Sequence, residues 1–303
     1  MTPLRSSLLA AAGSDAVRRA IAGSRLGAAA ARRLTAGPTT SDAVDAAGDL
    51  VEDGFRVVVE LLGEPGASRA AVERTVREHL ALLDSLHLHG LGADVEVAVT
   101  LPALGSALAE RVVVDSVSRV CAAADQCGTA VTIDSGDHTT GDLALRVLAE
   151  VRRHWPSTGI GLYASSRAAR ARCAALSGTR VRLSGDRGAE PASVAFVDPH
   201  EVDLSYVRCA NALLAGSGRP VFATDDPRLT EIVAERAQWY GRAPGSFEFL
   251  ARHGVRATGR LRLVAEGHSV RVRLPYGAEW YGYLVRTLVE RPAFVAAALV
   301  GRF

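Results

Sequence analysis

The stretch RVVVELLGEPGASRAAVERTVREHLALLDSLHLHGLGADVEVAVTL, residues 56–101, carries the pattern that decides the fold. It opens with the β-branched run Arg56–Leu62 and closes with a second run, Asp94–Leu101. Between these runs, apolar residues recur at the three- and four-residue spacing of an amphipathic helix, at Ala71, Val72, Val76, Leu80, Leu83 and Leu86. A strand, a helix and another strand in this order predict two parallel strands joined by a crossover helix.

The same alternation continues along the rest of the chain. Further strands are predicted at Thr129–Asp134, Gly159–Tyr163, Thr179–Leu183, Pro220–Ala223, Phe247–Leu250 and Val270–Leu274. Eight strand–helix units within about 250 residues match the size at which a parallel sheet closes into a barrel. An open, doubly wound sheet is the alternative, although no GxGxxG follows the first strand.

We therefore expect an α/β fold, a (β/α)8 TIM-type barrel, with additional N-terminal helices. Residues 1–50 are assigned to an N-terminal helical segment and residues 51–303 to the barrel. The last helix before the first strand is preceded by the capping candidates Thr39, Thr40, Ser41 and Asp42. No stretch of the sequence has the composition of a linker.

The composition of the chain argues against several classes of function. The 303 residues carry 35 basic and 33 acidic side chains, interspersed along the chain, which argues against nucleic acid as a partner. All the basic residues are arginines, so lysine-based chemistry is absent. The four cysteines show no CxxC spacing, which indicates a reducing compartment and no structural metal site. No apolar run approaches the roughly 20 residues that span a bilayer.

We thus expect a cytoplasmic protein with at most peripheral membrane contact. The start of the chain, Met1–Leu34, is rich in Ala, Arg and Ser, a composition also found in transit peptides. A surface helix of a bacterial protein is the simpler interpretation of this segment.

Active sites of such barrels form at the C-terminal ends of the strands and in the loops that follow. The candidates at these positions are Glu60, Gly63, Glu64, Thr100, Asp134, Asp137, Tyr163, Ser184–Gly188, Thr224, Asp225, Asp226, Leu250, Arg252 and Arg273–Gly277. A mouth with carboxylates and several arginines can bind a small zwitterion, but it can equally be a solvated rim of ion pairs. The residues by themselves leave both interpretations open.

Six segments of the chain resemble, in the same order, those of bacterial monofunctional proline dehydrogenases. They are ELLGE (Glu60–Glu64), TIDSGDHTT (Thr132–Thr140), EPASVAF (Glu190–Phe196), EVDLSYVRC (Glu201–Cys209), ATDDPRL (Ala223–Leu229) and RVRLPYGAEWYGYLVRTLVERP (Arg271–Pro292). The resemblance covers nearly everything from Leu34 onward. It implies an FAD-dependent barrel enzyme that takes hydride from Cδ of L-proline, yields pyrroline-5-carboxylate and passes electrons to a quinone.

The resemblance also assigns roles to residues. It implies that Glu64 pairs with Arg286 to help close the site, that Tyr283 lines the substrate pocket, and that Asp134 is the family's aspartate after the third strand. The catalytic candidates are Asp134, Tyr283 and Arg286, and the substrate-binding candidates are Glu64, Arg286, Tyr283, Arg273 and Arg252. The cofactor-binding candidates are Thr224, Asp225, Tyr163 and Arg182.

Several positions depart from the family pattern. The second of two arginines that grip the proline carboxylate is Thr287 here, although Arg252 and Arg273 are additional arginines at the mouth that can rebuild such a grip. Polar or cationic residues around the cofactor are replaced at Thr100, Tyr163, Ala168, Gly185, Asp225 and Leu250. Each lost charge-assisted hydrogen bond costs about 1.5–3 kcal/mol. The pattern therefore predicts FAD binding no tighter than roughly tens of micromolar.

Three hypotheses follow for the function. The first is an FAD-dependent proline dehydrogenase of proline catabolism. The second is a family oxidoreductase with an altered amino or imino acid substrate. The third is a catalytically impaired paralogue, a pseudoenzyme that keeps the barrel for a binding or partner role.

Overall fold

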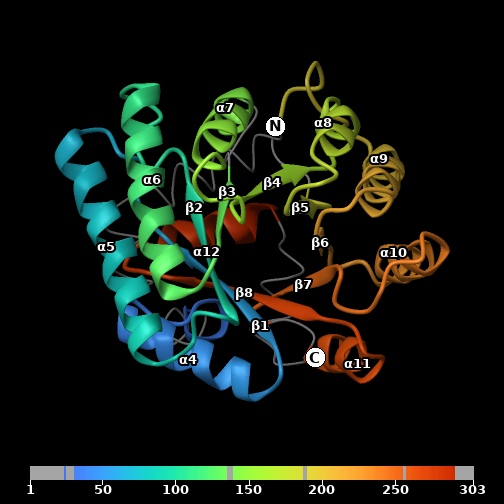
Figure 1. Ribbon diagram of the computed structural model, residues 1–303, viewed down its shortest axis with the longest axis horizontal. Coiled ribbons are helices and arrows are strands. Elements are labelled where there is room, and N and C mark those ends of the chain that lie inside the picture. Colours follow the sequence, from blue (N-terminus) through green and yellow to red (C-terminus); the bar gives the residue numbers. More distant parts are fainter. Residues whose placement is uncertain (1–23, 25–30, 135–138, 187–189, 255–256, 291–303) are drawn as a thin grey trace.

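The computed structural model describes residues 24, 31–134, 139–186, 190–254 and 257–290. Its centre is a closed barrel in which each of eight parallel strands pairs with the next and the last pairs with the first (Figure 1). The strands are β1 (Arg56–Leu61), β2 (Val95–Thr100), β3 (Val131–Asp134), β4 (Gly159–Tyr163), β5 (Val181–Ser184), β6 (Val221–Ala223), β7 (Glu248–Arg252) and β8 (Val270–Tyr276). The predicted barrel is confirmed.

A helix follows every strand, and Figure 1 shows most of these helices in a ring around the sheet. They are α5 (Arg69–Leu88), α6 (Glu110–Cys127), α7 (Gly141–Val151), α8 (Ala169–Ala175), α9 (Pro199–Leu214), α10 (Pro227–Trp239), α11 (Ala257–Ala265) and α12 (Trp280–Glu290). In addition, α4 (Thr40–Glu52) precedes β1 and packs against β1, β8 and α5.

The start of α4 bears out the predicted cap. Thr39 has an extended backbone, its hydroxyl accepts a hydrogen bond from the backbone N–H of Asp42, and the Asp42 carboxylate accepts one from the N–H of Thr39. This reciprocal capping box satisfies two backbone donors that a helix start leaves without partners. The helix ends at Glu52, and the proposed division at residue 50 remains a prediction.

Two apolar regions hold the barrel together. The larger core lies between the strands and the surrounding helices and contains side chains such as Val57, Val59 and Val97. Residues at alternate positions of a strand face the other side, because successive side chains point to opposite faces of a sheet. A small apolar layer therefore fills the middle of the barrel, made by Val58, Ala98, Val221, Ala223 and Leu250. Charged side chains lie at both ends of this layer.

The strand ends differ from the predicted ones by up to two residues. The strand expected to end at Leu250 continues to Arg252, and the last strand continues beyond Leu274 to Tyr276. Both extensions follow from pairing between distant segments, since Arg252 lies opposite Arg273, and Tyr276 lies opposite Leu61. Local sequence patterns carry no information on such register.

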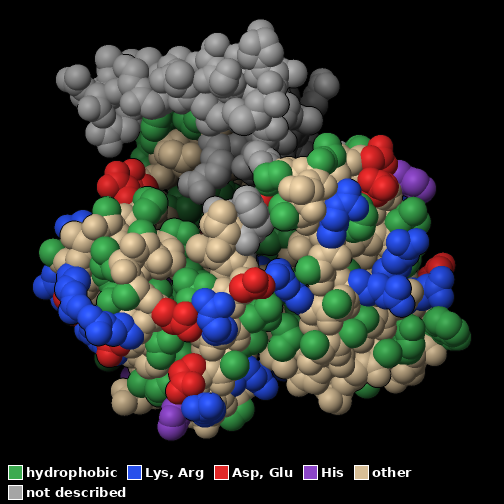
Figure 2. Space-filling model, turned by 90° about the horizontal axis from the view of Figure 1, so that it is seen from above, with side chains coloured by type: hydrophobic (Ala, Val, Ile, Leu, Met, Phe, Trp, Pro, Cys, Tyr) green, Lys and Arg blue, Asp and Glu red, His purple; other side chains and the backbone are tan. Residues whose placement is uncertain are grey.

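Among the described residues, no helix is both long and apolar enough to cross a membrane. On the face shown in Figure 2, acidic and basic side chains lie beside one another among uncharged ones.

Candidate active site

The C-terminal ends of the strands bring a set of charged side chains together, which we call the mouth cluster. It consists of Glu60, Asp134, Arg182, Asp186, Asp225, Arg252 and Arg273, with the Tyr163 hydroxyl at its edge. With Tyr163 included, these residues come from seven of the eight strands or from the loops just beyond them. The mouth cluster therefore lies where the sequence placed the site.

Asp134, the last residue of β3, lies at one side of the mouth cluster. It is buried and accepts hydrogen bonds from the guanidinium of Arg182 and, at 3.1 Å, from the hydroxyl of Tyr163. The negative charge of Asp134 and burial raise the pKa of Tyr163, which keeps that hydroxyl protonated. A second guanidinium nitrogen of Arg182, Nη1, is buried and has no hydrogen-bond partner among the described residues.

Arg273 forms the most regular ion pair of the mouth cluster. Its Nε and Nη2 atoms each donate to one oxygen of the Glu60 carboxylate at 2.7 Å, a bidentate arrangement that combines two charge-assisted hydrogen bonds. Burial by itself would lower the pKa of Arg273, but Glu60 and Asp134 raise it well above its ordinary value. Arg273 thus stays charged and is held in one orientation.

Arg252, at the end of β7, is held by two carboxylates. Its two terminal nitrogens donate to Asp186, just after β5, and to Asp225, just after β6. The neighbouring Asp226 faces elsewhere, because its side chain accepts from the Arg228 N–H at the start of α10 and caps that helix. Adjacent Asp225 and Asp226 therefore point apart.

The charges of the mouth cluster nearly balance one another. Three guanidinium groups face four carboxylates, and each guanidinium already has a carboxylate partner. The space beside these groups is small: the cavity that the three arginines, Asp186 and Asp225 line, together with Thr224 and Leu250, has a volume of about 10 Å³. That volume holds about one water molecule.

The remaining site candidates lie around this cluster. The Thr224 hydroxyl accepts from the Asp226 N–H at 3.1 Å and so shapes the loop after β6. On α12, burial raises the pKa of Tyr283, and the charges of Arg273, Glu60 and Arg252 also act on it. Thr287, on the same helix, donates its hydroxyl hydrogen to the Tyr283 carbonyl.

The expected pair of Glu64 and Arg286 stays a prediction. Glu64 is exposed just beyond β1, while the side chain of Arg286 lies outside the described residues. Sequence reasoning placed Glu60 and Asp186 among the candidates at the mouth but gave neither a role, yet these two acids hold Arg273 and Arg252. The signal for Glu60 was the two-residue alternation of β1, which places it on the same face as Val58 of the barrel interior.

A larger cavity of about 390 Å³ lies beside the mouth cluster, which we call the side cavity. It runs from the end of β4 past the starts of α7 and α8 and is lined by Tyr163, Ser165, Arg167, Ala168 and Arg172, among others. Tyr163 also lines the small cavity of the mouth cluster. The two spaces are therefore neighbours, and only the side cavity has room for a metabolite-sized ligand.

Known proteins resemble this chain over almost its whole length. Proline dehydrogenase 1 of Bacillus subtilis subsp. natto is 28% identical over 281 residues, which cover 92% of this chain and 91% of that protein. Proline dehydrogenase of Deinococcus radiodurans is 29% identical over 276 residues and covers 89% of both chains. The chain is thus similar to proteins named proline dehydrogenase over about nine tenths of its length. No family model matches it.

Solved structures agree with this likeness at the level of the fold. Proline utilization A (PutA) from Bdellovibrio bacteriovorus superimposes with a TM-score of 0.79 at 20% sequence identity over 90% of this chain. This chain spans only 34% of the length of that protein. The likeness to proline dehydrogenases therefore rests on the full-length relatives, and the PutA likeness supports the barrel.

The resemblance implies FAD, whose fit can be tested on the geometry of the mouth. A flavin ring needs far more space than the 10 Å³ that the mouth cluster encloses. The negative charges of Asp186 and Asp225 also face the same space, although both are paired with Arg252. As the side chains stand, the described residues do not fit a flavin ring at the mouth. Such a ring requires Arg252 to leave its two carboxylates.

Proposed function

We propose that this protein is a proline dehydrogenase that oxidises L-proline, or a close imino acid relative, to the corresponding imine and passes two electrons to a quinone. One observation carries the proposal: the relationship to proteins named proline dehydrogenase extends over about nine tenths of both chains. The mouth cluster also contains the charges that a zwitterionic amino acid requires, since it combines arginines with carboxylates.

The proposed substrate contacts follow from the ion pairs of the mouth. A proline carboxylate would replace both Asp186 and Asp225 on the guanidinium of Arg252, whose two terminal nitrogens would then bind it in the bidentate geometry that carboxylates prefer. Arg273 would supply a second positive charge, and Tyr283 would close the pocket from α12. Asp134 and Arg286 are the further catalytic candidates, and Glu64 completes the proposed substrate set.

FAD is part of this proposal on the condition that Arg252 leaves Asp186 and Asp225, and its proposed contacts are then Thr224, Asp225, Tyr163 and Arg182. The unpartnered Nη1 atom of Arg182 supports one of these roles, because a buried donor without a partner is costly unless a ligand takes it. The ion pairs of Arg252 oppose binding, since breaking them is part of the cost. We therefore expect FAD to bind weakly, with a dissociation constant of roughly tens of micromolar.

The test is an activity assay in which FAD is supplied in at least tenfold excess over that dissociation constant. The protein, purified from a flavin-replete host, is expected to be nearly colourless. With added FAD, proline should reduce a quinone analogue, and an imine product should form in equal amount. Omitting either FAD or proline should abolish both signals.

A matched pair of variants makes the assay specific. Arg252→Gln removes the proposed carboxylate grip and should raise KM for proline by about tenfold or more. Arg228→Gln removes an arginine that is also paired with an aspartate beside α10, but outside the mouth, and should leave KM unchanged. If the two variants have equal KM values for proline, Arg252 does not bind the substrate.

A second candidate function is favoured by the paired state of Arg252. If the ion pairs to Asp186 and Asp225 persist, the chain is a catalytically impaired member of the family that binds a ligand or partner without redox chemistry. This candidate predicts no proline-dependent reduction at saturating FAD while the protein remains folded. A yellow protein with stoichiometric flavin that proline bleaches would eliminate it.

A further inference from the structure

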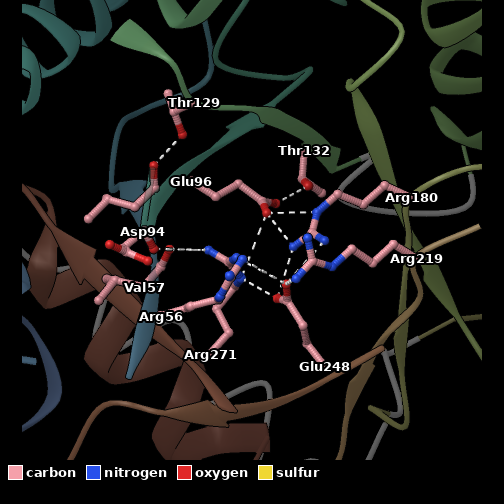
Figure 3. A network of polar contacts seen from close by, with 11 residues as sticks. Arg56, Val57, Asp94, Glu96, Thr129, Thr132, Arg180, Arg219, Glu248 and Arg271 are labelled. Atoms are coloured by element: carbon pink, nitrogen blue, oxygen red, sulfur yellow. Dashed lines mark hydrogen bonds and ion pairs between the residues drawn. The ribbon is translucent and has the colours of Figure 1, made fainter. Parts of the chain in front are cut away.

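The N-terminal end of the barrel holds a second group of charged side chains, which we call the lower cluster. It consists of Arg56, Glu96, Arg180, Arg219, Glu248 and Arg271 (Figure 3). The apolar layer that contains Val58, Ala98 and Leu250 lies between the lower cluster and the mouth cluster. Neither the proposed proline chemistry nor the flavin makes use of it.

Glu248 is the centre of the lower cluster and is completely buried. Its carboxylate accepts hydrogen bonds from Arg271 at 2.6 Å and from Arg180 at 3.1 Å. Glu96 is paired with Arg180 at 2.6 Å and also accepts from the hydroxyl of Thr132. Burial would raise the pKa of Glu248, but the two arginines lower it to about 2, so the carboxylate is ionised at neutral pH.

Two further arginines share the same carboxylate at longer distances. The nearest nitrogens of Arg56 and Arg219 lie 3.6 and 3.5 Å from Glu248, which is ion-pair distance but long for a hydrogen bond. Their side chains are 34% and 43% exposed, so their guanidinium groups remain accessible to a ligand. Burial and the charges of Arg56, Arg180 and Arg271 lower the pKa of Arg219, although Glu248 opposes this.

These arginines open onto a cavity of about 590 Å³ at the N-terminal face of the barrel. Its described lining contains five arginines but only three acidic residues, Glu96, Glu248 and Asp125. The fifth arginine, Arg152, donates to the carbonyls of Pro156 and Thr158 in the loop between α7 and β4. Arg56 and Arg219 have no such carbonyl partner among the described residues, and a surplus of two positive charges remains.

We propose that this cavity binds a compact oxyanion of the phosphate class, with a charge of −2 or more. Guanidinium groups match the oxygens of such anions, and two of them converge here on a space that is already positive. The described lining contains no aromatic side chain, which favours a free or simply esterified phosphate over a ligand that needs its base stacked. A purely structural role explains Arg180 and Arg271, which saturate the buried acids, but it leaves Arg56 and Arg219 in mutual repulsion.

The experiment is a calorimetric titration of the full chain with inorganic phosphate, pyrophosphate and AMP at constant ionic strength. Phosphate should bind saturably with a dissociation constant of roughly 1 mM or below, and pyrophosphate should bind more tightly because it carries more charge. If phosphate and AMP bind with equal dissociation constants, the site is assigned to the free anion. Tighter binding of AMP assigns it to a phosphorylated molecule.

Three single variants test the assignment. Arg219→Gln and Arg56→Gln should each weaken phosphate binding by about tenfold or more. Arg146→Gln makes the same charge change at an exposed ion pair with Glu110 and should bind phosphate as the wild type does. Either of two results overturns the proposal: no saturable binding by the wild type, or equal binding by the wild type, Arg219→Gln and Arg56→Gln. Because the cavity lies at the opposite end of the barrel, proline oxidation can fail without affecting this result.

Discussion

The two ends of the barrel are built from the same strands but differ in charge and in space. At the mouth cluster three arginines meet four carboxylates around a cavity of about 10 Å³. At the lower cluster four arginines share two glutamates and face a cavity of about 590 Å³. At the usual ligand end of this fold, internal ion pairs therefore fill the mouth cluster and leave room for a ligand only in the side cavity beside it, whereas the opposite end is open and positive.

The alternation of side chains along each strand produces this arrangement. On β8, Arg271 belongs to the lower cluster, and Arg273, two residues on, belongs to the mouth cluster. On β7, Glu248 and Arg252 occupy the two ends, and Leu250 lies in the apolar layer between them. Because the two-residue period places all these side chains inside the barrel, one strand supplies charge to both ends. The two clusters can therefore be altered separately by single substitutions.

The largest effect is expected from Glu248→Gln. This change removes the central carboxylate of the lower cluster and leaves the buried Arg271 and Arg180 short of negative charge. Removing one member of a buried ion pair costs about 3–5 kcal/mol, and the free energy of unfolding, measured with urea, should fall by that amount. Glu110→Gln, which breaks an exposed ion pair with Arg146, is the control and should change it little. Similar results for the two variants would show that the lower cluster does not stabilise the barrel.

The next effect is a loss of stability in acid. The pKa of Glu248 is about 2 in the folded protein and 4.5 in its ordinary state, so the group stabilises the fold above pH 4.5. This contribution is lost as the pH falls from 4.5 through about 2, and it amounts to roughly 3 kcal/mol. The difference in unfolding free energy between wild type and Glu248→Gln should therefore shrink over this range. A difference that stays constant down to the acid limit would contradict the assignment.

A smaller effect is expected when the mouth is opened. The double variant Asp186→Asn, Asp225→Asn removes both carboxylates that hold Arg252 and makes the mouth more positive. FAD, an anion, should then bind about tenfold more tightly, which corresponds to about 1.4 kcal/mol. The variant Asp203→Asn, Glu231→Gln makes the same charge change in exposed pairs of α9 and α10 and serves as the control. Unchanged affinity, measured by quenching of flavin fluorescence, would show that these ion pairs do not limit binding.

The barrel could be predicted from the sequence because its pattern is local and repeated. The run Arg56–Leu61 contains three consecutive β-branched valines, which suit a strand, and turn or helix signals bound it. The ends of β7 and β8 could not be predicted, since their last residues are strand only through pairing with a neighbour. A sequence pattern does not report which distant segment supplies that neighbour.

The candidate site was predicted in part. The position of Asp134, Asp225, Arg252 and Arg273 at one mouth followed from their places at strand ends, and the structure brings them together there. The partners of the arginines did not follow, because Glu60 and Asp186 meet Arg273 and Arg252 only after the barrel closes. The lower cluster was missed altogether. One residue in the sequence indicated it: Glu96 lies within the apolar run VEVAV and is buried. A buried charge requires partners, and only the fold shows which residues these are.

The smallest predicted effect is that of Arg219→Gln on the free energy of unfolding. It separates the two ends most directly, because removing an arginine from an ordinary ion pair lowers stability, whereas removing Arg219 should not. The pKa of Arg219 is lowered by burial and by the neighbouring arginines, which means that the folded protein disfavours its positive charge. Arg219→Gln should therefore leave the unfolding free energy unchanged or raise it slightly at low salt. Since its side chain is 43% exposed, solvent screens most of the repulsion, and a gain of no more than about 1 kcal/mol is expected.

Salt provides the internal control for this last prediction. Added sodium chloride screens the repulsion within the lower cluster and should stabilise the wild type more than Arg219→Gln. Arg252→Gln, which removes a paired arginine from the mouth, should instead lower stability at every salt concentration, because it leaves Asp186 and Asp225 facing each other without their shared cation. If Arg219→Gln also destabilised the protein, Glu248 would need all four arginines. The surplus of positive charge on which the anion site depends would then not exist.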